Sequence, residues 1–322
     1  YSAGLKRQMG KREGEEMKVK KLISGAAGIA GCIAGGMAAA AAVNKALARQ
    51  EERHLTPPGK IVEVNGHKMH VYGEGARTKV TCVFLSGGGT IAPVYDFRPL
   101  YRRLSPYYRC VVVEKAGYGY SEISAKSRRL DVMLEETRRA LILAGERGPY
   151  VLLPHSMSGL EAIYWAQKYP QEIKAIIGLD MAFPEAYEKA ENAGKGIGLL
   201  RLAAMLGLHR LPLFSLAADD GLTEEEYAQA KLLAKRNFMN RCIAAETDIV
   251  YENAALVGKS GLPEVPFLLF CSDGKDVADF WVELQRECAQ KLQAELIELP
   301  CGHYIHHFKA EEIVSEIRKF LE

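Results

Sequence analysis

A serine stands where a short apolar run changes into a helical pattern. The run Tyr150-Val-Leu-Leu-Pro-His leads into Ser156-Met-Ser-Gly-Leu, and the helical spacing continues to Tyr169. A sharp turn between a strand and a helix would project the Ser156 hydroxyl from the protein. A serine hydroxyl becomes a useful nucleophile when a base with a near-neutral pKa accepts its proton. His303, in Leu299-Pro-Cys-Gly-His303-Tyr, is the candidate base.

The elements that must position these two residues alternate along the chain. Asn65-Gly66 joins two strand-like runs, residues 60–64 and 67–72, in a hairpin. Short apolar runs, typical of strands buried on both faces, then alternate with helical patterns. The predicted strands are residues 80–85, 110–114, 150–153, 175–179, 267–270 and 296–299, and the predicted helices are residues 130–144, 160–169, 277–292 and 310–321. This order predicts an α/β sheet that is antiparallel at its start and parallel thereafter.

The segment around Ser156 resembles the nucleophile elbow of the α/β-hydrolase fold family, in its serine hydrolase branch of esterases and lipases. The family's G-x-S-x-G reads here Pro154-His-Ser156-Met-Ser158. Ser158 is small, as the elbow requires, whereas Pro154 is bulkier than Gly and has no N–H, so we expect a shifted or tighter turn. Ser158 as the nucleophile would place Leu160 at a small position, which fits less well. A plain turn with a capping serine is the alternative.

The resemblance implies a triad in the chain order serine, acid, histidine. It places the histidine after the last strand, where His303 lies. The acid is Asp276 in the first interpretation, because Asp-Gly-Lys-Asp276 follows the penultimate predicted strand. Asp273 in the same loop and Asp180, at the end of residues 175–179, are the alternatives. The two aspartates that are not the triad acid would have the ordinary role of an aspartate in a turn, which is to hydrogen-bond the nearby backbone.

The resemblance also implies two N–H donors for a tetrahedral oxyanion. Met157, which follows the nucleophile, supplies one, and Gly88 in Leu85-Ser-Gly-Gly-Gly89 supplies the other. A flexible glycine turn is the alternative for that loop. A second glycine segment, Gly117-Tyr-Gly119-Tyr-Ser121, follows the fourth predicted strand, and we expect its role to be structural.

Residues 182–262 interrupt the alternation and predict a helical cap inserted into a hydrolase domain that spans residues 59–322. Thr223 and Glu226 form a capping box that opens a helix running toward Phe238. A second cap helix has a broad apolar face, which we expect to pack against the core and in part to line a substrate pocket. Its members are Leu199, Leu200, Leu202, Met205, Leu206 and Leu208.

The N-terminal segment has the composition of a membrane-targeting sequence. Residues 1–21 form a basic flank, residues 22–43 carry no charge, and residues 44–58 are predicted to be a linker. Twenty-two helical residues would span about 33 Å, enough for the hydrocarbon layer. We predict an anchor that leaves the catalytic domain outside the cytoplasm. A signal cleaved near Ala42, which would give a secreted protein, and a soluble alanine-rich helix are the alternatives.

Composition narrows the classes of partner and cofactor. The chain has 322 residues, with 42 basic and 40 acidic side chains and a net charge of +2, so the footprint of a nucleic-acid binder is missing. The seven cysteines show no zinc spacing, and His306 and His307 are interpreted as loop or helix-start residues and not as a metal pair, because no carboxylate or cysteine completes the site. No metal and no cofactor is predicted.

Together these features predict a serine hydrolase that cleaves a carboxylic ester or related acyl bond through an acyl-enzyme. The predicted partner is a small, apolar acyl substrate, with the membrane contacted through residues 22–43. Serine at the elbow argues against epoxide or haloalkane hydrolysis, which in this family resemble aspartate-nucleophile chemistry. Amide, peptide or carbon–carbon cleavage by the same triad and a non-catalytic, membrane-tethered binding domain are the alternatives.

Overall fold

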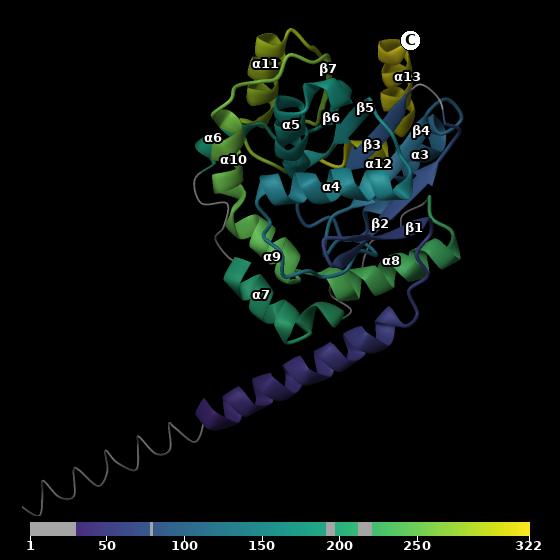
Figure 1. Ribbon diagram of the computed structural model, residues 1–322. Coiled ribbons are helices and arrows are strands. Elements are labelled where there is room, and N and C mark those ends of the chain that lie inside the picture. The colour runs from purple at the N-terminus through teal and green to yellow at the C-terminus, as the bar shows by residue number, and fades with distance from the viewer. Residues whose placement is uncertain (1–29, 78–79, 191–196, 212–220) are drawn as a thin grey trace, which may run out of the picture.

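A computed structural model describes residues 30–77, 80–190, 197–211 and 221–322. Its centre is an eight-stranded sheet in the order β1-β2-β4-β3-β5-β6-β7-β8 (Figure 1). The strands are β1 (Lys60–Val64), β2 (His67–Glu74), β3 (Thr81–Leu85), β4 (Arg109–Glu114), β5 (Tyr150–Pro154), β6 (Ile173–Leu179), β7 (Phe267–Cys271) and β8 (Glu295–Glu298). The pairs β1–β2 and β2–β4 are antiparallel and the others are parallel, which confirms the predicted fold class.

The strands form where the sequence places β-branched and aromatic residues between turns. Strands β3, β5 and β7 are buried at every position, as expected for strands with helices on both faces. The hairpin turn is confirmed at Asn65 and Gly66, which have φ of 51° and 83°. Both values lie in the left-handed region that tight hairpins need at their two central residues.

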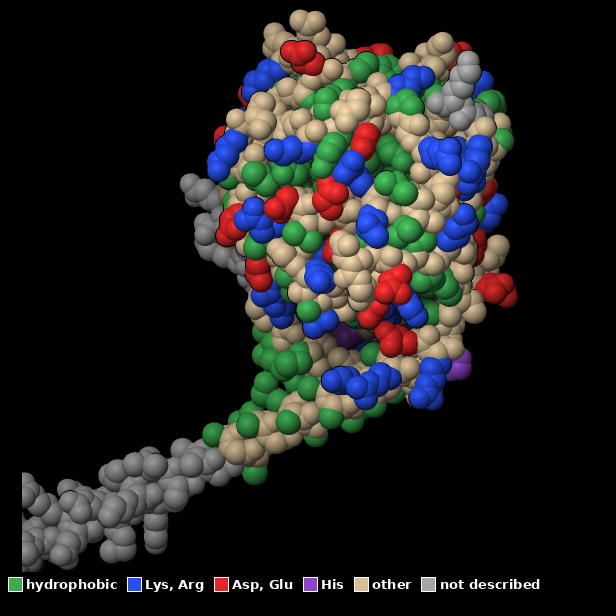
Figure 2. Space-filling view, in the orientation of Figure 1, with side chains coloured by type: hydrophobic (Ala, Val, Ile, Leu, Met, Phe, Trp, Pro, Cys, Tyr) green, Lys and Arg blue, Asp and Glu red, His purple; other side chains and the backbone are tan. Residues whose placement is uncertain are grey.

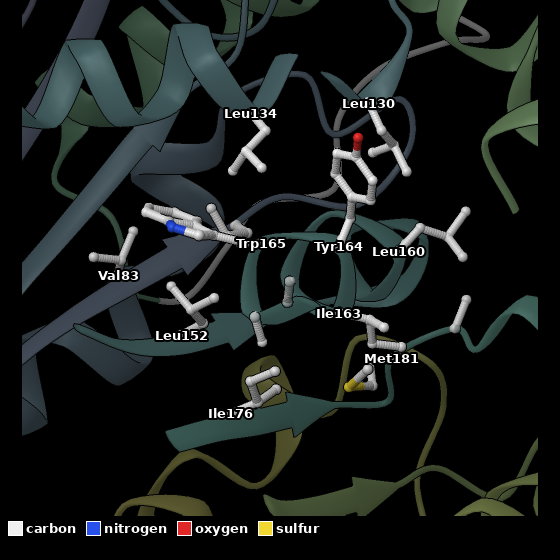
Figure 3. Close-up of a cluster of buried hydrophobic side chains, with 14 of the residues drawn as sticks. Val83, Leu130, Leu134, Leu152, Leu160, Ile163, Tyr164, Trp165, Ile176 and Met181 are labelled. Carbon is white, nitrogen blue, oxygen red and sulfur yellow. The ribbon is translucent and has the colours of Figure 1, made fainter. Parts of the chain in front are cut away.

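Helices cover both faces of this sheet and divide the core in two. The helices are α2 (Pro93–Asp96), α3 (Arg98–Leu104), α4 (Leu130–Ala144), α5 (Gly159–Lys168), α11 (Trp281–Leu292), α12 (Ile305–Phe308) and α13 (Ala310–Leu321). Helices α4, α5 and α11 pack on one face, where Trp165 lies among strand residues such as Val83 and Leu152 (Figure 3). Helices α3 and α13 cover the other face. Alternate strand residues point to opposite clusters, because side chains of a strand alternate between its faces.

Between β6 and β7 the described chain is helical. It forms α6 (Pro184–Lys189), α7 (Ile197–Met205), the 3-10 turn η3 (Leu208–Arg210), α8 (Glu224–Asn237), α9 (Arg241–Asp248) and α10 (Val250–Gly258), referred to below as the cap. The capping box that opens α8 is confirmed. The Thr223 hydroxyl accepts the Glu226 N–H at 3.2 Å, and the Glu226 carboxylate accepts the Thr223 N–H at 2.9 Å.

The expectation that α7 packs its apolar face against the core is wrong. Leu199 is 73% exposed, and Leu200, Leu202, Met205 and Leu208 are also exposed, while Leu206 is half-buried. Among the residues of this helix whose burial is described, Ala204 is the buried one, so a small residue makes the close contact and the leucines face outward. The spacing of the leucines predicted the helix, but spacing alone does not say which neighbour covers the apolar face.

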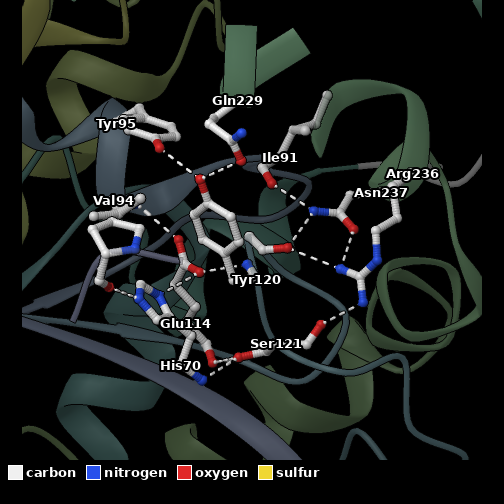
Figure 4. A network of polar contacts seen from close by, with 12 residues as sticks. His70, Ile91, Val94, Tyr95, Glu114, Tyr120, Ser121, Gln229, Arg236 and Asn237 are labelled. Atoms are coloured by element: carbon white, nitrogen blue, oxygen red, sulfur yellow. Dashed lines mark hydrogen bonds and ion pairs between the residues drawn. The ribbon is translucent and has the colours of Figure 1, made fainter. Parts of the chain in front are cut away.

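The loop after β4 joins the cap to the sheet (Figure 4). The buried Glu114 carboxylate accepts the Tyr120 N–H at 2.6 Å and the Val94 N–H at 3.0 Å. A side chain at Gly119, which has φ of 47°, would collide with this carboxylate. From α8, Asn237 donates to the Gly119 carbonyl at 2.8 Å. These contacts give the glycine segment the structural role predicted for it.

A helix covering Ala30–Glu52 runs beneath the cap (Figure 1). Residues 44–52, predicted to be linker, continue this helix, because the segment holds good helix formers and no proline before Pro57. Asn44 donates to the Ala204 carbonyl at 2.8 Å, and Glu51 and Glu52 pair with Arg210 and Arg236 of the cap. The predicted basic flank and residues 22–29 lie outside the described residues.

Candidate active site

Ser156 occupies a strained corner between β5 and α5. Its φ is 54°, a left-handed conformation that costs a non-glycine residue roughly 1–2 kcal/mol. The Ser156 carbonyl accepts the Ala182 N–H at 2.8 Å. Gly159 lies against the Ala182 backbone, where a side chain would collide. The turn therefore forms despite Pro154, and the His155 N–H donates to the Leu85 carbonyl at 3.0 Å, which continues the strand pairing past the proline.

Ser158 has a different environment. It is buried, and its hydroxyl lies 2.7 Å from the Leu85 carbonyl and 2.8 Å from the His155 carbonyl. A hydroxyl that bridges backbone carbonyls in this way stabilises the turn. The contacts of Ser158 leave Ser156, which is half-buried, as the serine at the corner.

His303 is held by Asp180. Its Nδ1 lies 2.6 Å from Asp180 Oδ2, and the other carboxylate oxygen accepts the Trp281 Nε1–H and the Ser272 N–H, both at 2.8 Å. Burial favours a raised pKa for Asp180, but these donors, led by His303, lower the pKa below its ordinary value. An ionised carboxylate only accepts, so Nδ1 carries the proton and the lone pair lies on Nε2.

The structure pairs His303 with Asp180 and not with Asp276, the first choice of acid. Asp276 is exposed and its carboxylate lies beside the Gly302 backbone, whereas the hydrogen bond to His303 comes from Asp180, the alternative. Asp273 accepts the Lys275 ammonium at 2.6 Å and the Lys275 N–H at 3.2 Å, which is turn chemistry. Strands β6 and β7 are neighbours, so both offered an acid at the same sheet edge. Asp180 follows β6 directly and has φ of 48°, a local conformation that motif spacing did not predict.

Ser156 and His303 belong to adjoining loops. The rings of His155 and His303 lie 4.7 Å apart, and His155 Nε2 lies 3.1 Å from the His303 carbonyl. Asp180 and Ala182 are two residues apart, and Ala182 donates to Ser156 as described above. The elbow, the histidine loop and the end of β6 therefore meet at one place on the sheet edge.

The glycine loop after β3 lies directly against the elbow. A side chain at Gly87 would come within 2.9 Å of the Ser156 Cβ, and one at Gly88 within 2.8 Å of the Met157 Cε. The Gly89 N–H is already used, since it donates to the Tyr118 hydroxyl at 3.1 Å. The close approach to Ser156 favours glycine at position 87, and the loop brings Gly88 beside Met157, the two predicted oxyanion donors.

Comparisons with known proteins agree with this architecture. Residues 83–197 match the family model of the alpha/beta hydrolase fold. The chain is also 36% identical over 290 residues to the uncharacterized protein YbdG of Bacillus subtilis, across 84% of this chain and 88% of that protein. The chain belongs to the alpha/beta hydrolase fold family.

Solved structures of low sequence identity share the fold, and a further relative matches in sequence. A probable hydrolytic enzyme of Pseudomonas aeruginosa PAO1 superposes with a TM-score of 0.65 at 15% identity, over 83% of this chain and 95% of that one. The haloalkane dehalogenase DbeA of Bradyrhizobium elkani gives 0.58 at 19% identity, over 81% and 96%. A cis-3-alkyl-4-alkyloxetan-2-one decarboxylase of Shewanella oneidensis is 22% identical over 80% of this chain and 86% of its own.

In this hydrolase Tyr118 links the cap to the glycine loop, beside a buried ion pair. Glu246 of α9 accepts the Lys115 ammonium at 2.5 Å and the Tyr118 hydroxyl at 2.7 Å, and Tyr118 in turn holds Gly89. Sequence analysis did not find Tyr118, Glu246 or the Trp281 that holds Asp180. Tyr118 lies in the glycine segment Gly117 to Ser121 that the sequence indicated, but nothing in that segment pointed to a partner in the cap.

A second polar cluster lies behind the histidine loop. His306 Nε2 lies 3.1 Å from Asp96 Oδ2, and His307 Nε2 lies 3.1 Å from Asp96 Oδ1. The sequence argument that no carboxylate completes this pair is therefore wrong, since α2 supplies Asp96 and the three groups are close enough to hold a metal ion. Metal-bound histidines normally donate through their second nitrogen, whereas the buried His306 Nδ1 has no hydrogen-bond partner among the described residues. The cluster fits a hydrogen-bond network that supports the loop of His303.

Buried His155 predicts a specific loss of stability in acid. Burial, followed by the charges of His306 and His303, lowers the pKa of His155 to about 3. Between the ordinary histidine pKa of about 6.5 and this value, the unfolded chain binds a proton that the folded chain does not. The free energy of unfolding therefore falls with decreasing pH in that window, by about 1.4 kcal/mol per pH unit for this one proton.

The variant His155→Gln tests this origin. Its amide still donates to the His303 carbonyl but does not titrate, so the slope of unfolding free energy against pH below 6.5 should be one proton smaller than in the wild type. Urea unfolding at a series of pH values measures both slopes. Equal slopes would show that His155 takes up its proton in the folded protein.

Proposed function

We propose that this hydrolase cleaves a carboxylic ester through an acyl-enzyme, with Ser156 as nucleophile. The observation that carries the proposal is the His303–Asp180 hydrogen bond of 2.6 Å in the loop adjoining a strained Ser156. A carboxylate that holds Nδ1 leaves Nε2 free to act as a base, and the strained corner presents the hydroxyl of a half-buried serine.

The proposed reaction has two halves. Ser156 Oγ attacks the acyl carbon while His303 Nε2 takes the hydroxyl proton, and the Gly88 and Met157 N–H groups stabilise the oxyanion. The carbon–oxygen bond of the ester breaks, and the alcohol leaves with the proton from His303. A water molecule then gives one proton to His303 Nε2 and attacks the acyl carbon. The bond between that carbon and Ser156 Oγ breaks, His303 returns the proton to Oγ, and the acid leaves. Asp180 orients the imidazole and stabilises its charged form throughout.

Serine at the elbow distinguishes this proposal from the chemistry of one similar structure and leaves open that of another relative. The Bradyrhizobium protein is named a haloalkane dehalogenase, and in this family that reaction resembles chemistry with an aspartate nucleophile. This chain has Ser156 at the position of the nucleophile. The Shewanella decarboxylase has a cyclic ester in the name of its substrate, so an oxetanone is a useful second substrate class to assay. An ester and an oxetanone both present a carbonyl to the same nucleophile.

A panel of p-nitrophenyl esters from acetate to palmitate tests the ester proposal. The cavity beside Met157 lies between Leu160 of α5 and Val250 of the cap, and its volume is only about 10 Å³. The leucines of α7 face outward and do not enlarge it. We therefore expect kcat/KM to fall at least about tenfold from butyrate to palmitate, since a long chain must displace packed side chains. Activity that rises with chain length would show that the cap opens, and inactivity on every ester would contradict the proposal.

We also propose that residues 22–43 anchor the chain in a membrane, with the hydrolase domain outside the cytoplasm. The described part of this segment belongs to the helix Ala30–Glu52, which contains an 18-residue window with a mean hydropathy of 1.3 and no buried residue. Separation of cells into membrane and soluble fractions tests the anchor. Recovery of the intact chain in the soluble fraction would contradict it, and a secreted chain beginning near Asn44 would favour signal cleavage.

A further inference from the structure

A cavity of about 660 Å³ lies between the N-terminal helix and the cap, far in sequence from Ser156 and His303. Its walls come from that helix, at Ala41 to Ala48, and from α7, η3, α8 and α9. Figure 2 shows Lys and Arg side chains gathered where the helix meets the body of the molecule, and hydrophobic side chains along the helix itself.

The described lining of this cavity is strongly basic. Six of its eighteen residues are lysine or arginine, and one, Asp248, is acidic. The six are Lys45, Arg201, Arg210, Lys235, Arg236 and Arg241. Glu51 and Glu52 neutralise part of this charge through their pairs with Arg210 and Arg236, which leaves an excess of positive charge around the cavity.

Two of the guanidinium groups have unused donors. Arg201 pairs with Asp248 at 2.7 Å and Arg210 pairs with Glu51 at 2.7 Å. Yet Arg201 Nε and Arg210 Nη2 are buried and have no acceptor among the described residues. A buried donor without an acceptor is unfavourable, and a phosphate group has several oxygens that match the fork of an arginine. It is the excess of lysine and arginine around the cavity that gives it the chemistry of a phosphate site.

The rim of the cavity is apolar and exposed. Met205 lines the cavity, and it is 49% exposed. The other exposed apolar side chains of α7 and the turn after it are Leu199, Leu200, Leu202, Leu208 and Leu211. Such a concentration within thirteen residues is a patch, and a patch of this kind marks a surface that contacts something apolar. Cationic side chains beside exposed leucines are the combination that binds the interface of a phospholipid bilayer.

We propose that α7, η3 and the basic cavity form a membrane-docking surface, in which the cavity binds the phosphate of a phospholipid headgroup. The predicted membrane segment ends at Val43, and the cavity wall includes Ala41 and Lys45, so the cavity lies where that segment would leave the bilayer. Headgroup phosphates are concentrated at that depth, and acyl chains below them would cover the leucines of α7. The docking goes beyond the proposed hydrolysis and does not depend on it.

The first test asks whether α7 enters the acyl region. The full-length chain carrying Leu202→Trp is reconstituted into phosphatidylglycerol vesicles with brominated acyl chains, which quench tryptophan at short range. We expect a loss of fluorescence that is absent in unbrominated vesicles. Leu143→Trp, at an exposed leucine of α4 outside the cap, is the matched control and should keep its fluorescence. Equal behaviour of the two variants would overturn the docking surface.

The second test identifies the ligand. In detergent, a saturating short-chain phosphatidylglycerol should raise the Tm of the full-length chain by roughly 2–4 °C. The diacylglycerol of the same chain length should not. The double variant Arg201→Gln with Arg210→Gln should lose the shift, whereas Arg103→Gln with Arg286→Gln, which removes the same charge outside the cavity, should keep it. An equal shift from inorganic phosphate would make this a site for free anions, and no shift from the lipid would exclude the headgroup. Both results overturn the proposal, and neither bears on Ser156.

Discussion

Replacement of Ser156 by Ala should lower kcat on p-nitrophenyl esters by roughly 10⁴-fold or more, because the variant has no hydroxyl to form the acyl-enzyme. The turn should persist, since its backbone contacts with Ala182 and Leu85 do not use the Ser156 side chain. At this φ of 54°, an alanine makes the same steric demands on the backbone as the serine that it replaces. Steady-state kinetics measures the loss, and the Tm of the variant reports whether it is folded.

The neighbouring serine gives the matched control for this variant. Ser158→Ala removes two hydroxyl contacts with the Leu85 and His155 carbonyls, so it should lower the free energy of unfolding by about 1 kcal/mol and keep most of the activity. A fluorophosphonate probe should label the wild type and Ser158→Ala but not Ser156→Ala. A folded wild-type chain that neither reacts with the probe nor hydrolyses esters would favour the non-catalytic binding domain.

The sheet could be predicted from the sequence because its signals are local. Buried strands give continuous apolar runs, and the hairpin at Asn65-Gly66 has its own turn chemistry, so strand order along the chain and the antiparallel start both followed. The elbow was also local, since Ser156 lies between a strand and a helix within a few residues. Short helices such as α2 and α12 were not predicted, because four residues contain too little periodicity to be recognised.

The site was only partly predictable, because its acid depends on tertiary contacts. Asp180 and Asp276 both follow strands that end at the same sheet edge. The choice between them depends on which carboxylate reaches His303 Nδ1 when α11 places Trp281 against Asp180. The same limit applies to α7, whose spacing predicted a helix but not that its leucines would face outward. Periodicity describes one element, and burial depends on its neighbours.

The two acids give the sharpest test of the His303 geometry. Asp180→Asn should lower kcat by about 10³–10⁴-fold, because an amide nitrogen facing Nδ1 favours the tautomer that leaves no lone pair on Nε2. Asp276→Asn, at an exposed residue, should change kcat less than about threefold. The wild-type carboxylate also stabilises the fold: its pKa is lowered, so this stabilisation is present above the ordinary aspartate pKa and is lost as pH falls through the folded value. Asp180→Asn should therefore be less stable than the wild type at pH 7, with a difference that narrows toward acid in urea unfolding. Loss of activity in Asp276→Asn with retention in Asp180→Asn would require His303 to change partners during catalysis.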